Sequence, residues 1–411
     1  MKELIKKFIP PFLLSWYHLA LVFLGAVLYG FPSKKLKIIG VTGTNGKTTV
    51  VSLVTGILES AGFKVASLSS IKFKIGDKEN PNTLKMTMPG RFKLQKFLKQ
   101  AAGDSCRYAV LEVSSEGIKQ HRHRFINFEA AVFTNLSPEH IEAHGGFEKY
   151  KKAKGKLFQA TKRIHVVNID DKNADYFLGF KAKKTYTYGW EKGDVNTKNT
   201  AFELPLIGRF NVYNALAAIC VGLSQGVSLE TCRKFLEKAE GIPGRMEEVI
   251  SSSFRAIVDY AVTPDALGQL YQTIKETFSP KKLIAVFGSC GGGRDKWRRP
   301  VLGEIAAEYC DRIIVTNEDP YDEDPSQILS EIKSGISKSQ FPESNFYEIL
   351  DRRQAIRKAL ELAEPGDVIA ITGKGCEPWI AEAKGRKIPW DDRKGVREEY
   401  ERIRNSGMPG R

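Results

Sequence analysis

Short runs of apolar residues alternate along this chain with longer stretches in which apolar residues recur every three or four positions. Residues 37–41 form the first apolar run, and a glycine-rich turn separates them from residues 48–61, which have helical spacing. Further runs typical of buried strands are present at 108–113, 130–135 and 163–168. This alternation predicts a mostly parallel sheet that is covered by helices on both faces.

The same alternation starts again after residues 241–245. Apolar runs at 256–260, 283–288, 312–316 and 367–372 are each followed by a stretch with helical spacing. Such a series is typical of a second α/β domain of the Rossmann type. The predicted fold class is therefore α/β, with a central domain on a mostly parallel sheet and a Rossmann-like C-terminal domain.

The N-terminal stretch 8–32 differs from both series because it contains no Asp, Glu, Lys or Arg, so that His18 is the one side chain that could carry a charge. The stretch is long enough for a membrane-spanning helix. A span would carry Lys6 and Lys7 across the membrane, which the positive-inside tendency disfavours. We therefore favour a helix that docks on the protein or lies at a membrane surface, and a true span is the second alternative.

Composition adds a preference for anionic partners. The 411 residues are 42% hydrophobic and 27% charged, as in folded proteins, and 63 Lys and Arg against 48 Asp and Glu give a net charge of +15. This excess favours nucleotides, phosphorylated intermediates or anionic lipid headgroups. No run interleaves basic and aromatic residues, so no nucleic acid is expected. The six cysteines form no C-x-x-C pair, which favours reduced thiols in the cytoplasm.

The sharpest local motif is the glycine-rich turn itself, Gly43-Thr44-Asn45-Gly46-Lys47-Thr48-Thr49. Glycines let backbone amides converge on phosphate oxygens, and the helix N-terminus adds a favourable partial charge. Lys47 is expected to neutralise the β- and γ-phosphates, and the Thr48 hydroxyl to bind magnesium. Val41 stands where the strict pattern has glycine, so the motif is a variant phosphate loop.

Further motifs follow in one collinear series along residues 38–400. They are Leu111-Glu112-Val113-Ser114-Ser115, Gln120-His121-Arg122, Val132-Phe133-Thr134-Asn135-Leu136-Ser137, Glu139-His140, Tyr150-x-x-Ala153-Lys154, Gly208-x-Phe210-Asn211-Val212-x-Asn214, Gly241-Ile242-Pro243-Gly244-Arg245-Met246-Glu247, Val258-Asp259-Tyr260-Ala261, Gly292-x-Arg294-Asp295, Asp319-Pro320 and Lys374-Gly375-x-Glu377. With the phosphate loop, this series resembles the Mur ligases of peptidoglycan synthesis, most closely the muropeptide tripeptide synthetases.

The resemblance implies an ATP-dependent amide-bond-forming ligase that releases ADP and phosphate. A muropeptide carboxylate is phosphorylated, and an amino acid then attacks the acyl phosphate, so catalysis depends mainly on positioning and charge neutralisation. The implied cofactors are ATP and magnesium, and the implied partners are a UDP- or lipid-linked muropeptide and an amino acid. The chain is expected to divide into a hydrophobic helical segment (1–37), an ATP-binding domain (38–242) and a Rossmann-like ligase domain (243–411).

The resemblance also implies roles for single residues. The expected nucleotide contacts beyond the phosphate loop are Asn214 to the adenine, Arg245 to the phosphates and Asp259 to the ribose. The expected metal ligands are Thr48, Glu112 and His140, and Lys154 is expected to be carbamylated, which turns it into an anion. The expected substrate contacts are Ser114, Ser115 and Arg122 for the muropeptide, and Arg294, Asp319 and Glu377 near the amino acid.

The chain also departs from the family pattern. Only about forty residues precede the phosphate loop, where the tripeptide synthetases carry a UDP-binding domain, so a UDP-linked acceptor must be held differently or the acceptor is lipid-linked. The D-N-P-R motif of diaminopimelate specificity reads Glu318-Asp319-Pro320-Tyr321. Loss of that arginine removes a partner for a second carboxylate, so diaminopimelate, lysine and other amino acids all remain open.

Two alternatives to a muropeptide ligase stay open at this level. A folylpolyglutamate-synthase-like or other peptide ligase shares the phosphate loop and also lacks the UDP-binding domain. A catalytically inactive nucleotide-binding scaffold at the membrane is the other, since Glu116, Val262 and Cys376 stand where the family has histidines. Residues 8–32 supply the peripheral membrane contact of that hypothesis.

Overall fold

The computed structural model describes residues 10–84 and 86–405, which form two compact units. Of these residues, the first unit takes those up to Pro138 together with Gly145–Pro205 and Phe210–Ala239, and the second takes Glu139–His144, Leu206–Arg209 and those from Glu240 onward. The segment Glu139–His144, which includes helix α6 (Ile141–His144), lies within the range 38–242 in sequence but packs with the second unit.

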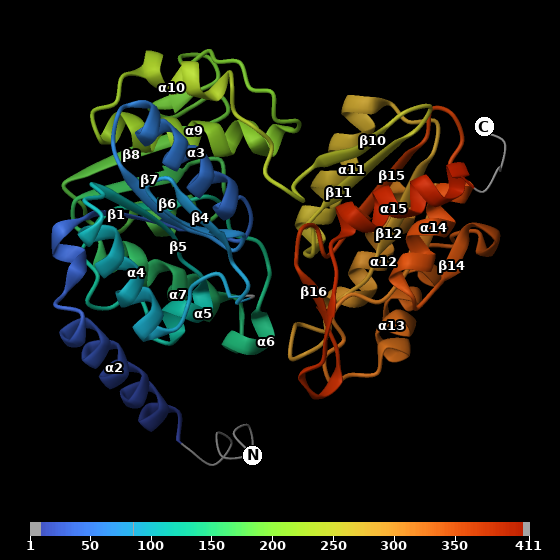
Figure 1. Ribbon diagram of the computed structural model, residues 1–411, viewed down its shortest axis with the longest axis horizontal. Helices are drawn as coiled ribbons and strands as arrows, with labels where there is room; N and C mark the ends of the chain where they lie inside the picture. Colours follow the sequence, from blue (N-terminus) through green and yellow to red (C-terminus); the bar gives the residue numbers. More distant parts are fainter. Residues whose placement is uncertain (1–9, 85, 406–411) are drawn as a thin grey trace. The chain divides into compact units, whose positions relative to one another are not determined.

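The first unit is built on a nine-stranded sheet in the order β4-β3-β2-β5-β1-β6-β7-β8-β9 (Figure 1). From β2 through β5, β1, β6, β7 and β8 to β9, each strand pairs in parallel with the next one in the sheet. The β3–β4 hairpin adds an antiparallel edge beside β2. The expected mostly parallel sheet is confirmed. The strands are β1 (Lys37–Thr42), β2 (Val65–Leu68), β3 (Lys72–Ile75), β4 (Lys78–Pro81), β5 (Tyr108–Glu112), β6 (Phe128–Phe133), β7 (Ile164–Asn168), β8 (Lys184–Gly189) and β9 (Val195–Asn196).

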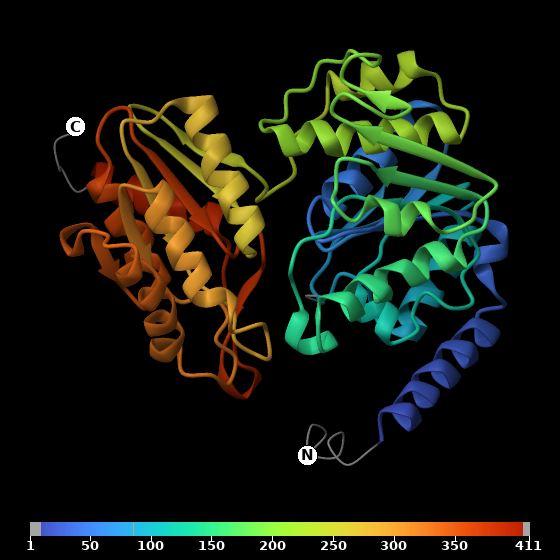
Figure 2. The ribbon, with the colours of Figure 1, turned by 180° about the vertical axis from the view of Figure 1, so that it is seen from behind.

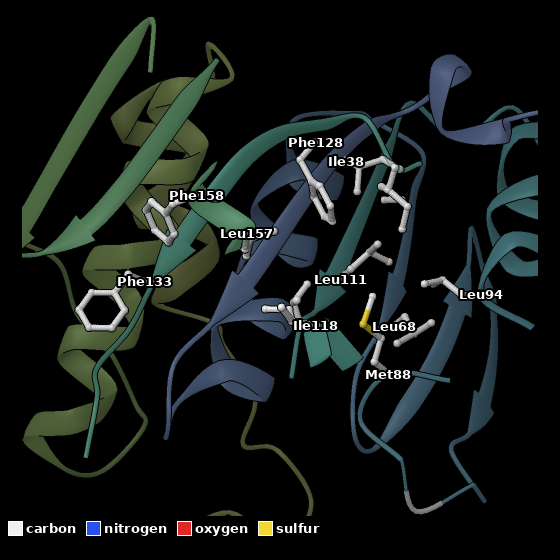
Figure 3. Packing of buried hydrophobic residues seen from close by; sticks show 14 of the residues in the cluster. Ile38, Leu68, Met88, Leu94, Leu111, Ile118, Phe128, Phe133, Leu157 and Phe158 are labelled. Carbon is white, nitrogen blue, oxygen red and sulfur yellow. The ribbon is translucent and has the colours of Figure 1, made fainter. Parts of the chain in front are cut away.

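Helices cover both faces of this sheet. The helices are α3 (Lys47–Ser60), α9 (Arg209–Ser224) and α10 (Leu229–Leu236) on one side, and α4 (Arg91–Gly103), α5 (Ser115–Lys119), α7 (Phe147–Ala160) and α8 (Ala174–Leu178) on the other. Figure 3 shows the core under the second group, where Leu94 of α4, Ile118 of α5 and Leu157 of α7 face the buried side chains of the strands. This packing fixes the strand ends that carry the candidate site.

The parallel order brings several candidate loops to one edge of the sheet. Strand β1 lies between β5 and β6, and all three run in the same direction. The phosphate loop follows β1, Val113 to Ser115 follow β5, and Thr134 to Ser137 follow β6. Because the carboxyl ends of parallel strands meet at one edge, these loops are neighbours, which is the usual position of a ligand site in an α/β fold.

The second unit is a six-stranded sheet in the order β10-β11-β15-β12-β13-β14, with only β10 antiparallel (Figure 2). Its strands are β10 (Glu247–Ser251), β11 (Arg255–Asp259), β12 (Leu283–Phe287), β13 (Arg312–Val315), β14 (Phe346–Glu348) and β15 (Val368–Thr372), with a separate hairpin of β16 (Trp379–Ala381) and β17 (Lys387–Pro389). Its helices are α11 (Pro264–Phe278), α12 (Arg298–Tyr309) and α13 (Pro325–Lys338) around one core, and α14 (Arg352–Leu362) and α15 (Asp392–Asn405) around another. The Rossmann-like arrangement is confirmed.

Helix α2 (Pro11–Leu28) runs along the outside of the first unit, and a short 3-10 turn (Pro32–Lys35) connects it to β1. Val22, Gly25 and Ala26 are buried, and Gly25 lies against Phe92 and the Gln95 side chain of α4. Residues 1–9 of the predicted segment 1–37 lie outside the described part of the chain. Within residues 10–84 and 86–405, no helix has both the length and the apolar character that a membrane crossing requires.

A glycine in the middle of α3 allows close packing of α10. A Cβ atom at Gly56 would lie 2.1 Å from the Phe235 ring, whereas one at Gly103, the last residue of α4, would have no atom within 4 Å. We expect Gly56→Ala to lower the free energy of unfolding by about 1–3 kcal/mol, because the overlap outweighs the better helix propensity of alanine. Gly103→Ala is the control and should leave it unchanged or raise it slightly. Denaturant titration of both variants checks this, and equal stabilisation by the two would contradict the packing.

Candidate active site

The phosphate loop joins β1 to α3, and two of its glycines are required by close contacts. Gly46 precedes the helix in a left-handed conformation with φ of 80°, and a Cβ there would lie 2.3 Å from Asn214 Oδ1. Gly43 has φ of 152°, and a Cβ there would lie 1.8 Å from Thr134 Oγ1. Any side chain at either position would push the loop away from its neighbours.

Hydrogen bonds from the loop after β6 hold the phosphate loop in place. The Asn45 amide donates to Asn135 Oδ1 at 2.8 Å, and Thr134 Oγ1 donates to the Asn45 carbonyl at 2.7 Å. The Thr44 amide donates to the Asn135 carbonyl at 2.9 Å. Lys47 Nζ donates to the Thr44 carbonyl at 2.7 Å, so the ammonium lies over its own loop, where phosphates bind in such turns.

Glu112 ends the buried strand β5 and meets the start of α3. The Thr48 hydroxyl donates to Glu112 Oε2 at 2.9 Å, and the Ser70 amide donates to the same oxygen at 2.8 Å. Glu112 is only 2% exposed. Two of the three expected metal ligands therefore lie side by side at the phosphate loop, and Ser70 joins them.

The third expected ligand, His140, packs with the second unit. Arg294 donates to His140 Nε2 at 3.3 Å, and the neighbouring Glu139 accepts from Arg298 at 3.2 Å. Asp295 accepts the backbone amides of Ile141 and Glu142 at 2.8 and 3.0 Å, which fixes this segment to the second unit. Within residues 10–84 and 86–405, no cluster of three His, Cys, Asp or Glu side chains forms a metal site by itself.

Lys154 projects from α7 onto the phosphate loop. Its Nζ donates to the Gly43 carbonyl at 2.6 Å and lies 4.6 Å from the centre of the Tyr150 ring. The Tyr150 hydroxyl is 3.1 Å from Thr44 Oγ1. Lys154 is 2% exposed although it belongs to a basic run, so it is not part of a solvated face.

The remaining candidates of the first unit have local structural roles as well. Asn214 Nδ2 donates to Asn211 Oδ1 at 3.1 Å, which confirms that the two share one face of α9, and Asn214 borders Gly46. Ser114 caps α5 by accepting the Gly117 amide at 3.1 Å, and Ser115 is buried in the first turn of that helix. Arg122 donates to the Met88 carbonyl and to Gln120 Oε1.

Arg245 and Asp259 are neighbours in the second unit. The Arg245 guanidinium lies 4.4 Å from the centre of the Tyr260 ring, and Asp259 accepts the Met246 amide at 2.7 Å. Burial raises the pKa of Asp259, although Arg245 acts in the opposite direction. The pair thus presents a cation and a carboxyl group from adjacent segments.

A buried lysine links the two carboxylates that are expected near the amino acid. Lys374 Nζ lies 2.9 Å from Asp319 and 2.6 Å from Glu377, and the Tyr260 hydroxyl donates to Glu377 at 3.0 Å. Burial lowers the pKa of Lys374, but Glu377 and Asp319 raise it more, so the ammonium stays charged. Tyr321, in place of the expected arginine, has a pKa raised to about 12, first by burial and then by Asp319.

Sequence reasoning did not assign several side chains that shape these sites. Ser70, Asn135 and Tyr150 hold the phosphate loop and Glu112, and Lys374 joins the acidic pair. Asn135, Tyr150 and Lys374 lie within quoted motifs, which was the available signal. Ser70 lies in no such motif, and only the pairing of β2 with β5 brings it to Glu112.

Comparison with known proteins gives consistent results along nearly the whole chain. The Mur ligase middle domain matches residues 41–222, and the Mur ligase glutamate ligase domain matches residues 244–375. A UDP-N-acetylmuramoyl-L-alanyl-D-glutamate–2,6-diaminopimelate ligase of Syntrophomonas wolfei is 38% identical over 92% of this chain and 81% of the relative. The corresponding ligase of Aquifex aeolicus is 37% identical over 90% and 78%.

Solved structures agree. A 2,6-diaminopimelate ligase of the same name has 34% identity and a TM-score of 0.58 over 90% of this chain and 79% of its own. A folylpolyglutamate synthase of Mycobacterium tuberculosis in complex with ADP has a TM-score of 0.68 over 90% and 94%, but its 18% identity shows the fold alone.

A phosphate loop on a parallel sheet, followed by a Rossmann-like domain, defines an ATP-using α/β enzyme. The matches along both domains then place the chain in a single family: it belongs to the Mur ligases. It is an ATP-dependent amide-bond-forming ligase that adds an amino acid in peptidoglycan synthesis, as the motif series predicted. The relatives favour this over the folate-type and inactive alternatives.

The geometry at Gly46 yields a test of the nucleotide site. Gly46→Ala should weaken ATP binding at least about tenfold, because the methyl group would displace either the loop or Asn214. Gly62→Ala is the matched control, since Gly62 also has a left-handed φ of 83° but no atom within 4 Å of a Cβ. Titration calorimetry with ATP should show unchanged affinity for the control; equal affinities for both variants would argue against the tight loop.

Proposed function

We propose that this ligase transfers the γ-phosphoryl group of ATP to a muropeptide carboxylate at the phosphate loop, with magnesium held by Thr48 and Glu112. The observation that carries the proposal is the cluster of Thr48, Glu112 and Ser70 at the start of α3, directly after Lys47. These groups meet where the strand ends of β1 and β5 lie side by side.

The reaction requires two displacements. A carboxylate oxygen of the acceptor attacks the γ-phosphorus, and ADP leaves. The amino nitrogen of the incoming amino acid then attacks the acyl carbon, phosphate leaves, and the nitrogen loses a proton to give the amide. Lys47 contributes a fixed positive charge to the phosphates, and the loop amides orient them, so the protein acts mainly by positioning and neutralisation.

The donor set at Glu112 fits magnesium. Thr48 and Ser70 offer hydroxyl oxygens and Glu112 a carboxylate, and magnesium prefers oxygen ligands from few carboxylates together with phosphates and water. When bound, the metal neutralises charge on the transferred phosphoryl group. His140 is the expected ligand of a second ion, and its Nε2 atom would have to exchange Arg294 for that ion.

Lys154 is proposed to act as its carbamate. The Lys154 side chain is buried, and its Nζ atom lies beside the Gly43 carbonyl of the phosphate loop and over the Tyr150 ring. A carbamate there would supply an anion that orients magnesium, whereas the free ammonium donates to the loop backbone. The two states differ in charge, so they can be separated by substitution.

The second unit supports an amine with a single carboxylate. The relatives are named for 2,6-diaminopimelate, which has two. In this chain Tyr321 supplies no positive charge, and Lys374 is already paired with Asp319 and Glu377. We propose that Arg294 binds the α-carboxylate of the incoming amino acid and Glu377 its ammonium, so that lysine or another amino acid with one carboxylate is preferred.

A direct assay tests the reaction. Purified protein with magnesium-ATP, a panel of UDP-linked and lipid-linked muropeptides and mixed amino acids should release ADP and phosphate only when acceptor and amino acid are both present. Lys47→Ala should lower kcat about a thousandfold, because it removes a charge that acts on the phosphoryl group. Chelation of the metal should stop turnover reversibly.

Lys154→Arg is the informative companion variant in the same assay. Arginine keeps a donor for the Gly43 carbonyl but forms no carbamate under these conditions, so we expect it to be as inactive as Lys154→Ala. Full activity of Lys154→Arg would exclude the carbamate. Exclusive incorporation of diaminopimelate would contradict the single-carboxylate proposal and leave the ligase proposal intact.

We also propose that α2 lies on an anionic membrane surface, peripherally and without crossing it. Its outward side is a continuous apolar stripe of large side chains that are 47–69% exposed: Phe12, Leu13, Trp16, Tyr17, Phe23, Leu24, Val27 and Leu28. The rings of Phe31 and Phe125 both contact Phe23 of this stripe. The exposed basic residues Lys34, Lys35 and Arg124 lie close to these two phenylalanines in the chain and therefore flank the stripe. Apolar and aromatic side chains flanked by basic groups favour an interfacial helix.

Sedimentation with vesicles of phosphatidylglycerol and phosphatidylcholine tests the membrane contact. Leu24→Asp should reduce the bound fraction about tenfold, because it removes apolar burial and adds a repelled charge. Leu178→Asp is the matched control, since Leu178 is an exposed leucine of α8 in the same unit. Equal binding of the two variants, or no binding of the wild type, would refute the contact.

A further inference from the structure

Two arginines and two histidines converge beneath α2. Arg91 is the first residue of α4, Arg122 follows α5, and His121 precedes Arg122. Arg91 donates to His18 Nδ1 of α2, and His121 Nε2 is hydrogen bonded to Ser15 Oγ of the same helix at 2.8 Å. The helix therefore contributes to this cluster from its inward side, opposite to the apolar stripe.

The two arginines make this cluster positively charged. Among the described residues, no carboxylate forms an ion pair with Arg91 or Arg122, and the Nε atoms of both are buried without a hydrogen-bond partner. Glu116 is the nearest influence of opposite sign, but it accepts from Gln120 rather than from a guanidinium. Two half-buried guanidiniums without counter-ions are unusual, because buried charges are normally paired.

The electrostatic consequence is visible in the same groups. Burial lowers the pKa of Arg122, and Arg91 lowers it further. The pKa of His18 is lowered to about 4, first by burial and then by Arg91, His121 and Arg122, so the imidazole is neutral and accepts from Arg91. Burial also lowers the pKa of His121, followed by Lys156, Arg124 and Arg91. Burial is the largest cause of these shifts, and repulsion between the basic groups adds to it. An anion in this place would relieve that repulsion.

The cluster is connected to the phosphate loop through one short segment. Arg122 donates to the carbonyl of Met88, and the preceding Thr87 is 3.0 Å from Ser70 through their hydroxyl groups. Ser70 in turn donates to Glu112. An acceptor bound at the phosphate loop could thus extend along Thr87 and Met88 to the arginines.

We propose that Arg91 and Arg122, with His18 and His121, bind the diphosphate group through which the muropeptide acceptor is attached to its carrier. The inference rests on the proposed function, because it assigns a place to part of that substrate. Two guanidiniums offer more parallel donors than one carboxylate can accept, and a diphosphate has both the oxygens and the charge to use them. Helix α2 then forms one wall of the acceptor site.

The diphosphate could belong to a nucleoside or to a lipid carrier, and three probes separate these sources. The full-length protein is saturated with magnesium and a non-hydrolysable ATP analogue, so that the phosphate loop is occupied. It is then titrated calorimetrically with inorganic pyrophosphate, UDP and geranyl diphosphate. We expect pyrophosphate to bind; tighter binding of UDP than of geranyl diphosphate assigns a nucleotide carrier, and the reverse order assigns a lipid carrier.

Variants show whether the cluster is responsible. Arg91→Ala and Arg122→Ala should each weaken pyrophosphate binding about tenfold, as expected for the loss of one charge-assisted contact. Lys93→Ala, which removes an exposed charge from the same helix α4, should change it less than twofold. Absence of pyrophosphate binding to the wild type, or equal weakening by Arg91→Ala and Lys93→Ala, would overturn the proposal.

A merely structural role of Arg91 predicts a different pattern. If Arg91 only fastens α2, then Arg91→Lys, which keeps the charge and a donor for His18 but not the planar donor pair, should bind pyrophosphate like the wild type; we expect it to bind more weakly. In turnover, Arg91→Ala should raise KM for the acceptor and leave KM for ATP unchanged. Lys47→Ala should retain pyrophosphate binding at the cluster while ligation is lost, so failure of the ligase proposal and failure of the diphosphate site are distinguishable.

Discussion

The architecture of the site depends on two places where the backbone of the phosphate loop approaches other chain segments without a Cβ atom between them. Gly43 lies against Thr134, and Gly46 lies against Asn214. The first contact ties the loop to the end of β6, and the second ties the start of α3 to α9. The end of β6 and two helices on one side of the sheet, α3 and α9, are thereby fixed to one short turn. Lys47, Thr48 and the loop amides owe their positions to this constraint.

Much of the fold is legible in the sequence because its signals are local. Each apolar run that predicts a strand forms one within two residues of the expected bounds, from β1 to β15. Buried parallel strands need nearly continuous apolar residues, so few other patterns mimic them. The β3–β4 hairpin was not predicted, because Lys72–Ile75 and Lys78–Pro81 form a polar, accessible edge without such a run.

The candidate site can be predicted only in part, because only some of its residues have a local sequence signal. The glycines and Lys47 form a compact motif, and Glu112 ends a recognisable strand. By contrast, Ser70 reaches Glu112 only through sheet pairing, and the segment Glu139–His144 joins the second unit through Asp295, more than 150 positions later along the chain. The role of α2 beside Arg91 and Arg122 has no local signal at all, since a hydrophobic stretch alone does not reveal which side chains it covers.

Helix α7 gives the core an indirect hold on the chemistry. Tyr150 and Lys154 contact consecutive residues of the phosphate loop, while Leu157 and Phe158, one turn further along, are fully buried against the sheet, where Leu157 also packs close to Gly40. Residues at these spacings share one side of a helix. Apolar contacts in the core therefore fix the position of α7 along its axis. That position in turn determines where the Lys154 side chain meets the phosphate loop. Substitutions in the core beneath α7 can therefore lower the turnover rate although they change no residue that contacts a substrate.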